Sequence, residues 1–376
     1  MDFENVVLPA LILLIGMLVS WLSVRRILSL STKVSRTWRR VAERIVLSVV
    51  VLLAVAVAGS ATFNTIALLY FRANNPPPGD AYIVSGHKMH MYCTGSGSPT
   101  IVLDAEGGAD ALEWGGVQPE LSKTTRVCAY DRAGQGWSDP LPAPRDADHI
   151  AAELHGLLLE AKITGPIVLM GHSIAGMYIR DYATRYPADV AGLIFVDTST
   201  PFQDEDPAVK AAIAKKMPMG GMLLIRAVYA AGIPRLEGAC SQPIPGFEAH
   251  AGKLLAEDSC YARWGAFVAE VFDSFNQSSQ ETVHTGPYGA LPILIFSEDP
   301  AIEGADWPAD VVSIGERAQE DLKKLSTRSR RIIAKGSTHQ IPIDRADLIE
   351  KEVPRFIQQI RGTAPQPTNY GSTITE

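Results

Sequence analysis

The hydrophobic positions of this chain follow two different patterns. The first 71 residues hold two long, almost uniformly apolar stretches, Val6 to Val24 and Ile45 to Phe71, each long enough to cross a bilayer. Beyond Asp80 the apolar residues come in short runs, separated by segments of helical period. A buried core helix is the alternative for each long stretch, but such a helix normally carries a polar stripe. The pattern therefore predicts a membrane anchor with two transmembrane helices at 1–71.

The short runs predict strands that alternate with helices, which indicates an α/β domain with a mostly parallel sheet covered on both faces. The predicted strands are Tyr82 to Val84, Lys88 to Cys93, Thr100 to Asp104, Arg126 to Tyr130, Ile167 to Met170, Ala191 to Val196, Pro292 to Phe296 and Arg330 to Ala334. The main predicted helices are His149 to Ala161, Ile174 to Tyr186, Val311 to Leu325 and Ala346 to Ile360. This domain covers 81–361, after a proline-rich linker at 72–80 and before a tail at 362–376 that we expect to be disordered.

Charge adds an orientation to the two predicted spans. Basic residues concentrate between them, whereas the charged residues before the first one, Asp2 and Glu4, are both acidic. Cytoplasmic loops carry the excess of Lys and Arg. The basic residues are Arg25, Arg26, Lys33, Arg36, Arg39, Arg40 and Arg44. We therefore expect the loop in the cytoplasm and the α/β domain on the other side. The net charge of -7 gives no sign of nucleic-acid binding.

One strand-to-helix junction carries candidate chemistry. In G-P-I-V-L-M-G-H-S-I-A-G, at Gly165 to Gly176, a buried strand is broken by Gly171 and a helix starts at Ile174, so Ser173 lies on the sharp turn between them. Such a turn exposes a serine hydroxyl and is typical of a nucleophile elbow, although Ala175 stands where a second glycine is usual. A helix-capping serine after a buried strand is the alternative.

With this junction and three further motifs, the chain resembles the α/β-hydrolase superfamily over roughly Tyr82 to Ile360. The further motifs are A-Y-D-R-A-G-Q-G-W-S-D at Ala129 to Asp139, R-Y-P-A-D-V-A-G-L-I-F-V-D at Arg185 to Asp197, and G-S-T-H-Q-I-P-I-D-R-A-D at Gly336 to Asp347. The resemblance implies the α/β-hydrolase fold, with a mainly helical cap at 198–288. It also implies a catalytic triad in the chain order serine, acid, histidine.

The triad partners are expected from that order. His339 follows a strand and precedes a helix, where the superfamily carries its general base, whereas His250 and His284 lie in or at the end of the cap. The acid should follow the strand Pro292 to Phe296, which favours Asp299, with Glu298 second. Asp197 is a third option, because some relatives carry the acid there.

The oxyanion hole needs two backbone N–H groups. The resemblance implies that Ile174 supplies one and Gly107 the other, from the loop Ala105-Glu106-Gly107-Gly108. Glu106 stands where relatives usually carry glycine, and its carboxylate would oppose a developing oxyanion unless it is paired or turned away. Asp131 and Arg132 are interpreted as structural, and Trp137 as structural or lining the site.

These residues predict a membrane-anchored serine hydrolase that cleaves a carboxylic ester without cofactor or metal. A catalytically silent binding module and an acyltransferase or thioesterase are the alternatives. The sequence contains no phosphate loop, zinc-binding H-E-x-x-H or dinucleotide fingerprint. A methionine- and leucine-rich cap stripe, at Met217, Met219, Met222, Leu223, Leu224, Ile225 and Val228, would suit an apolar acyl pocket or form cap-helix core.

The four cysteines form an even number without metal-like spacing, which favours two disulfides over buried free thiols. In the fold that the resemblance implies, the second and fourth strands are antiparallel neighbours, which brings Cys93 beside Cys128. Cys240 and Cys260 then remain as a pair within the cap.

Overall fold

The structure is a computed structural model that describes residues 3–30, 38–141, 144–201, 203, 206–216, 218–241, 249–258, 260 and 264–376. The chain divides into two compact units. The first comprises residues 1–76, 218–245 and 252–264, and the second comprises residues 77–217, 246–251 and 265–376.

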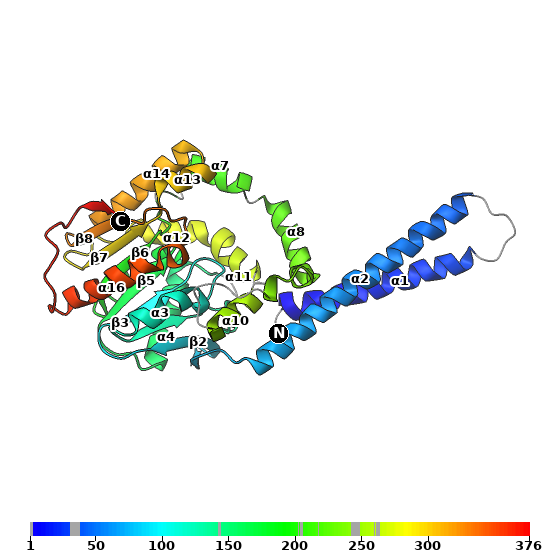
Figure 1. Cartoon of the computed structure of the whole chain (residues 1–376), viewed down its shortest axis with the longest axis horizontal. Helices are drawn as coiled ribbons and strands as arrows, with labels where there is room; N and C mark the ends of the chain where they lie inside the picture. The colour runs from blue at the N-terminus through cyan, green and yellow to red at the C-terminus, as the bar shows by residue number, and fades with distance from the viewer. Residues whose placement is uncertain are drawn as a thin grey trace. The chain divides into compact units, whose positions relative to one another are not determined.

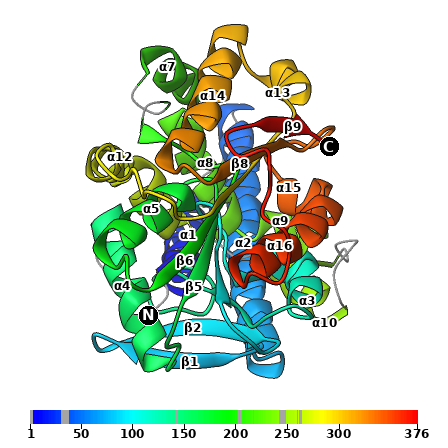
Figure 2. The ribbon, with the colours of Figure 1, turned by 90° about the vertical axis from the view of Figure 1, so that its left-hand side faces the viewer.

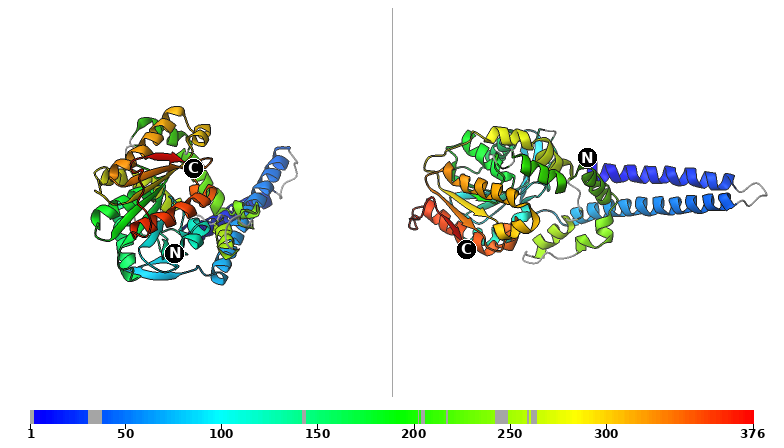
Figure 3. Two further views of the ribbon diagram at one scale, coloured as in Figure 1. Left: turned by 60° about the vertical axis from the view of Figure 1, so that its left-hand side comes forward. Right: turned by 90° about the horizontal axis from the view of Figure 1, so that it is seen from above.

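The first unit is built on an antiparallel hairpin of two long helices, α1 (Leu8–Ser29), preceded by the π-turn η1 (Phe3–Val7), and α2 (Trp38–Asn74), seen side by side in Figure 3. Among the described residues, the helical stretches Asn5–Ser29 and Trp38–Asn74 are long and apolar enough to cross a membrane, with mean hydropathies of 2.4 and 2.5. Only 17% and 11% of their most apolar windows are buried, unlike the core helices of a soluble domain. They are therefore candidate membrane spans.

The two helices approach closely at Gly16, where an added Cβ would lie 3.0 Å from Ala58 Cβ. Arg26 forms an ion pair with Glu43 near the turn of the hairpin, with Nε and Oε1 2.7 Å apart. Lys33 and Arg36, part of the predicted basic loop, lie outside the described residues.

The first unit also contains much of the expected cap. Its cap elements are α8 (Met219–Ala230), α9 (Ile233–Leu236), η3 (Ala239–Ser241) and part of α10 (Ala249–Asp258). The predicted disulfide Cys240–Cys260 is present here and closes this segment. The expected cap at 198–288 is thus divided between the two units.

The second unit holds a nine-stranded sheet of order β1-β2-β4-β3-β5-β6-β7-β8-β9. Several of its strands, among them β5, β6, β7 and β8, are labelled in Figure 1. Strand β2 runs antiparallel to β1 and β4, and the pairs from β4 to β9 are parallel. The strands are β1 (Asp80–Val84), β2 (His87–Thr94), β3 (Thr100–Asp104), β4 (Val127–Tyr130), β5 (Ile167–His172), β6 (Val190–Val196), β7 (Ile293–Ser297), β8 (Ser329–Ile333) and β9 (Thr373–Thr375).

Helices cover both faces of this sheet (Figure 2). On one face α4 (Ala147–Glu160) and α5 (Ala175–Arg185) pack on Leu169. On the other, η2 (Ala111–Gly116), α3 (Gln118–Leu121) and α16 (Ala346–Ile360) pack on Val168 and Met170. Alternate residues of one strand thus enter two cores, which explains the continuous apolar runs in the sequence. The remaining elements are α7 (Pro207–Lys216), α11 (Trp264–Val268), η4 (Ala269–Asp273), α12 (Phe275–Thr282), α13 (Pro300–Asp306), α14 (Ala309–Asp321), η5 (Leu322–Leu325) and α15 (Ile341–Asp344).

Two expectations about this unit have clear outcomes. Cys93 lies directly opposite Cys128 in the β2–β4 ladder and is bonded to it, as predicted. The expectation of a disordered tail at 362–376 is wrong, because β9 pairs with β8 and Ile374 packs against the core. Thr, Pro and Gln are common in disordered segments, but a three-residue strand needs only one apolar anchor and a free sheet edge.

Candidate active site

Ser173 lies on the turn that joins β5 to α5, as the elbow motif predicts. Its φ of 57° is in the left-handed region, where a residue with a side chain is strained. An added Cβ at Gly171 would lie 3.0 Å from the backbone of Ala175, and one at Gly176 would lie 2.3 Å from Thr198 Cβ. The tight turn therefore requires glycine at 171 and 176 and tolerates alanine at 175. It leaves Ser173 half-buried at the carboxyl edge of the sheet.

His339 lies in the loop between β8 and α15, and its imidazole contacts one carboxylate directly. Its Nδ1 is 2.6 Å from Oδ2 of Asp197, the residue that follows β6. The second Asp197 oxygen, Oδ1, accepts a hydrogen bond of 3.0 Å from the Glu298 N–H. Asp197 is buried and has a φ of 43°, so its backbone is strained as that of Ser173 is. A buried carboxylate on Nδ1 leaves the other ring nitrogen, Nε2, free to exchange protons.

This geometry differs from the expectation for Asp299, which does not supply the carboxylate on His339 Nδ1. Asp299, the favoured residue, caps α13 by accepting from the Ala301 N–H, and its other oxygen accepts from the Gly336 N–H. These backbone hydrogen bonds hold the pKa of the Asp299 carboxyl below its ordinary value. Asp299 is therefore a loop-stabilising residue, whereas Asp197, the third option, contacts the imidazole. The resemblance places the acid after β7, which favours Asp299, and the sequence cannot show that Asp197 at the end of β6 faces the loop that carries His339.

The pKa values of Asp197 and its acidic neighbour Glu298 are shifted in opposite directions. Burial alone would raise the pKa of Asp197, but the hydrogen bond and charge of His339 and the Glu298 N–H bring it below the ordinary value. Burial and the Asp197 charge instead raise the pKa of Glu298 to about 9. At neutral pH Asp197 is thus the ionised group, as a partner that orients an imidazole must be, and Glu298 is protonated.

The loop after β3, Ala105 to Gly108, brings Gly107 beside Ile174. An added Cβ at Gly107 would lie 3.5 Å from Ile174 Cγ2 and only 2.6 Å from Val271 Cγ2, so no larger residue fits there. Buried Arg132 holds this loop from below by donating to the carbonyl oxygens of Ala105, at 2.6 Å, and Glu106, at 2.7 Å. These two hydrogen bonds therefore fix the backbone of the loop, which lies close to the start of α5.

Arg132 is itself held by two buried carboxylates. It lies 2.6 Å from Asp104 and 2.9 Å from Glu270 of η4. Burial would lower the pKa of Arg132, but Glu270 and Asp104 raise it well above its ordinary value. Asp131 bonds His90 and the N–H groups of Ala111 and Trp137. Asp131 and Arg132 thus have the structural roles that the sequence predicted.

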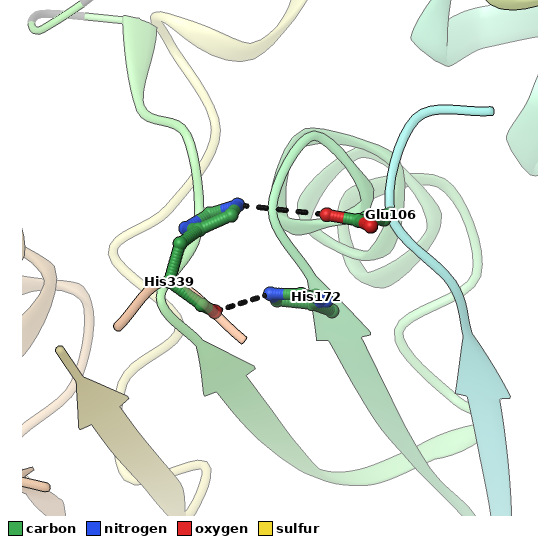
Figure 4. A group of neighbouring side chains, drawn as sticks. All are labelled: Glu106, His172 and His339. Carbon is green, nitrogen blue, oxygen red and sulfur yellow. Dashed lines mark hydrogen bonds and ion pairs between the residues drawn. The ribbon is translucent and has the colours of Figure 1, made fainter. Parts of the chain in front are cut away.

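Glu106, the residue that departs from the superfamily pattern, faces the imidazole. Its Oε2 lies 3.8 Å from Nε2 of His339, an interaction shown in Figure 4. Both carboxylate oxygens also accept from Gln340 Nε2, at 3.1 and 3.0 Å. The Glu106 carboxylate is thus paired with the Gln340 amide. Pairing is one of the two conditions stated above for a carboxylate beside a developing oxyanion.

A second histidine supports the loop that carries His339. His172 Nε2 lies 2.9 Å from the His339 carbonyl oxygen, and His172 Nδ1 lies 2.5 Å from Glu113 Oε1 (Figure 4 shows the former contact). Burial alone would lower the pKa of His172, but the Glu113 carboxylate raises it to about 9. His172 is therefore a buried imidazolium that donates from both nitrogens. Sequence reasoning missed this pair, and its only signal was the position of His172 immediately before Ser173.

Two clusters within the described residues have donor atoms close enough to hold a metal ion, namely Glu106 with His172 and His339, and Asp197 with Glu298 and His339. In each cluster at least one imidazole nitrogen is already hydrogen-bonded. Both His172 nitrogens donate hydrogen bonds, and His339 Nδ1 is bonded to Asp197. The donor set therefore fits a hydrogen-bonded network better than a metal centre.

Comparison with known proteins identifies the family. The profile described as "Alpha/beta hydrolase family" matches residues 96–352, well over half of the chain. The chain therefore belongs to the alpha/beta hydrolase family.

Several curated relatives match over shorter stretches. An uncharacterised protein of Schizosaccharomyces pombe is 34% identical over 154 residues, which cover 33% of this chain and 29% of that protein. An uncharacterised vacuolar membrane protein of Saccharomyces cerevisiae is 30% identical over 125 residues, which cover 32% of this chain and 19% of that protein. The chain spans at most 39% of the length of the first three curated relatives that it matches.

Solved structures share the fold at low sequence identity. An esterase of Thermogutta terrifontis superposes with a TM-score of 0.52 and 18% identity, covering 76% of this chain and 99% of the esterase. A bacterial membrane phospholipase A superposes with a TM-score of 0.53 and 19% identity, covering 85% and 99%. At this identity the likeness establishes the α/β-hydrolase fold.

Proposed function

We propose that this protein is a membrane-associated serine hydrolase that cleaves a carboxylic ester, with Ser173, His339 and Asp197 as its triad. The single observation that carries the proposal is the 2.6 Å contact between His339 Nδ1 and buried Asp197. This contact joins the ends of β6 and β8 at the sheet edge where β5 presents Ser173. The esterase and phospholipase neighbours and the two apolar helices support the same class.

The chemistry follows from these roles. Ser173 Oγ attacks the ester carbonyl carbon while His339 Nε2 takes the hydroxyl proton, and Asp197 stabilises the imidazolium that forms. The N–H groups of Ile174 and Gly107 hold the oxyanion. The tetrahedral intermediate then collapses, and His339 returns the proton to the leaving alcohol. Water then attacks the acyl-enzyme while His339 takes its proton, and His339 returns this proton to Ser173 Oγ as the ester bond breaks and the carboxylic acid is released.

Labelling with a fluorophosphonate probe tests the proposal on the full chain. The probe forms a covalent bond to an activated serine, so we expect labelling of the wild type and none of Ser173→Ala or His339→Ala. Ser122→Ala, which changes a half-buried serine whose hydroxyl donates to the Pro119 carbonyl, is the matched control and should label normally. Labelling of Ser173→Ala that equals the wild type would overturn the nucleophile.

A catalytically silent binding module is the second candidate, because the Glu106 carboxylate lies 3.8 Å from His339 Nε2. In that case neither the wild type nor Ser122→Ala would be labelled. Glu106→Gln separates the two functions, since it removes the charge and keeps the side-chain size. If Glu106 opposes the oxyanion, Glu106→Gln should gain ester turnover. If Gln340 pairs it effectively, turnover should change little.

A further inference from the structure

Part of the cap packs against the second apolar helix of the anchor and belongs to the same compact unit. Arg235 of α9 donates from Nε to Asn64 Oδ1 of α2 at 2.7 Å, and its guanidinium pairs with Glu257. Gly232, with a φ of 74°, begins α9 so close to α2 that an added Cβ would lie 2.7 Å from Asn64 Cβ and 2.9 Å from the Ser60 carbonyl oxygen. The start of α9 is therefore fixed against the Ser60–Asn64 turn of α2.

That turn lies level with one end of the apolar hairpin. Thr65 Oγ1 contacts the Asn5 carbonyl oxygen at 3.1 Å, so Thr65 is level with the start of α1. The apolar stretch of the first helix runs from Val6 to Val24, and at about 1.5 Å per residue it matches the roughly 30 Å hydrocarbon core of a bilayer. The end near Asn5 is opposite the Arg26–Glu43 pair. Thus α9 meets α2 at a boundary between hydrocarbon and headgroups.

Helix α8 continues directly into this contact and exposes apolar side chains. It ends two residues before Gly232, and the Gly232 N–H donates to the Tyr229 carbonyl. Leu224 is 64% exposed and Ile225 41% exposed, and Leu236 of α9 is 62% exposed. Single exposed apolar residues are ordinary on a water-facing surface. Here, however, they lie on two short helices anchored at the edge of a membrane-spanning hairpin.

Leu224 and Ile225 of the cap stripe are exposed, so they do not form a covered core of the cap. Side chains of Met217, Met219, Met222 and Leu223 lie outside the described residues. Arg226 is the one charged residue in the α8 sequence. Farther along α2, Lys253 Nζ reaches Asn75 Oδ1 at 2.9 Å and lies 5.5 Å from the Phe71 ring centre. A cation and an aromatic ring at the end of an apolar stretch are typical of the membrane interface.

We propose that α8 and α9 form an interfacial element that binds the lipid surface, with Leu224, Ile225 and Leu236 among the acyl chains. The occupant of this apolar surface is the bilayer, because the surface is continuous with helices that themselves cross it. Moving a leucine or isoleucine side chain from water into an apolar environment is favourable. A short apolar helix at the interface can bind lipid in this way without spanning the bilayer.

Fluorescence quenching by lipids tests this without any measurement of activity, so its outcome is independent of the proposed hydrolase function. The full-length Leu224→Cys variant is labelled with an environment-sensitive fluorophore and reconstituted into vesicles of phosphatidylcholine and phosphatidylglycerol that carry spin-labelled acyl chains. We expect blue-shifted emission that loses most of its intensity to the quencher. The control is Leu159→Cys, a 59% exposed leucine on α4 of the hydrolase unit, which should show water-like, unquenched emission.

Water-like, unquenched emission at position 224 would overturn the proposal. Folding is checked by retention of both native disulfides in non-reducing peptide maps. If Leu224→Cys does not fold, Ile225→Cys on the same helix takes its place, with the same expected and overturning results.

Discussion

His172 donates a hydrogen bond from its Nε2 to the main-chain carbonyl of His339, across 2.9 Å. The two residues are far apart in the chain, yet one precedes the nucleophile and the other is the general base of the proposed triad. Because Glu113 holds the other nitrogen of His172, this imidazolium fixes the backbone of His339 relative to β5. This hydrogen bond therefore ties the loop that carries His339 to the end of β5, next to Ser173.

The assignment of the triad acid predicts opposite results for two aspartates. Asp197→Asn should lower kcat by about 10³–10⁴-fold, because the imidazole loses the carboxylate that orients it and stabilises its charge. Asp299→Asn should leave kcat close to wild type, since the Asp299 carboxylate accepts from the Ala301 and Gly336 N–H groups, whereas the His339 imidazole bonds Asp197. Ester hydrolysis by both purified variants is the measurement. A large loss with Asp299→Asn and none with Asp197→Asn would restore the assignment made from sequence.

The charge on His172 predicts a pH dependence of stability. Its pKa is raised from 6.5 to about 9 in the folded protein, so folding takes up a proton between these values. The stabilisation is fully present below pH 6.5, falls as the pH rises toward 9 and is lost above it. A shift of this size corresponds to about 3 kcal/mol.

Thermal unfolding of the full chain in detergent, across this pH window, checks the charge on His172. We expect His172→Gln to have a flatter stability profile than wild type. The matched control is His155→Gln, which replaces a histidine stacked on Tyr186 and should keep the wild-type slope. Equal slopes for wild type and His172→Gln would show that His172 is neutral.

The Cys93–Cys128 bridge predicts a loss of stability when it is removed. The double variant Cys93→Ala/Cys128→Ala leaves no odd thiol, and closing a loop of 35 residues is worth about 4 kcal/mol in the chain-entropy model. Denaturant unfolding with and without reductant measures the difference. A reductant effect that is the same in the variant and the wild type would assign it to Cys240–Cys260 instead.

The excess of basic residues between the two apolar helices predicts the side of the membrane on which the hydrolase domain lies. A reporter that is active only outside the cytoplasm, fused after Asp80, should be active, whereas the same reporter fused within the 31–37 loop should be silent. The two fusions control for each other. The reverse pattern would place the domain in the cytoplasm.

Much of the fold could be predicted because its signals are local. The strand β5 and the following turn need buried apolar residues and glycine at Gly171, and helix α16 begins and ends at the predicted residues, Ala346 and Ile360. Pairing Cys93 with Cys128 required only the strand order that the superfamily motifs imply, together with an in-register ladder. The three-residue strand β9 was too short to produce such a pattern.

The sequence by itself determined the turn that carries Ser173, the loop that carries His339, the apolar helices and the α/β alternation, because each depends on residues close together in the chain. Only the tertiary structure decided that Asp197 rather than Asp299 meets His339, that His172 and Glu113 support this loop, and that α9 packs on α2. Each of those depends on how side chains from distant elements are oriented. In the sequence, Asp197 at the end of β6 and Asp299 after β7 are equivalent, since each follows a strand. They differ in the folded protein, where the strained backbone at Asp197 turns its carboxylate toward the His339 imidazole.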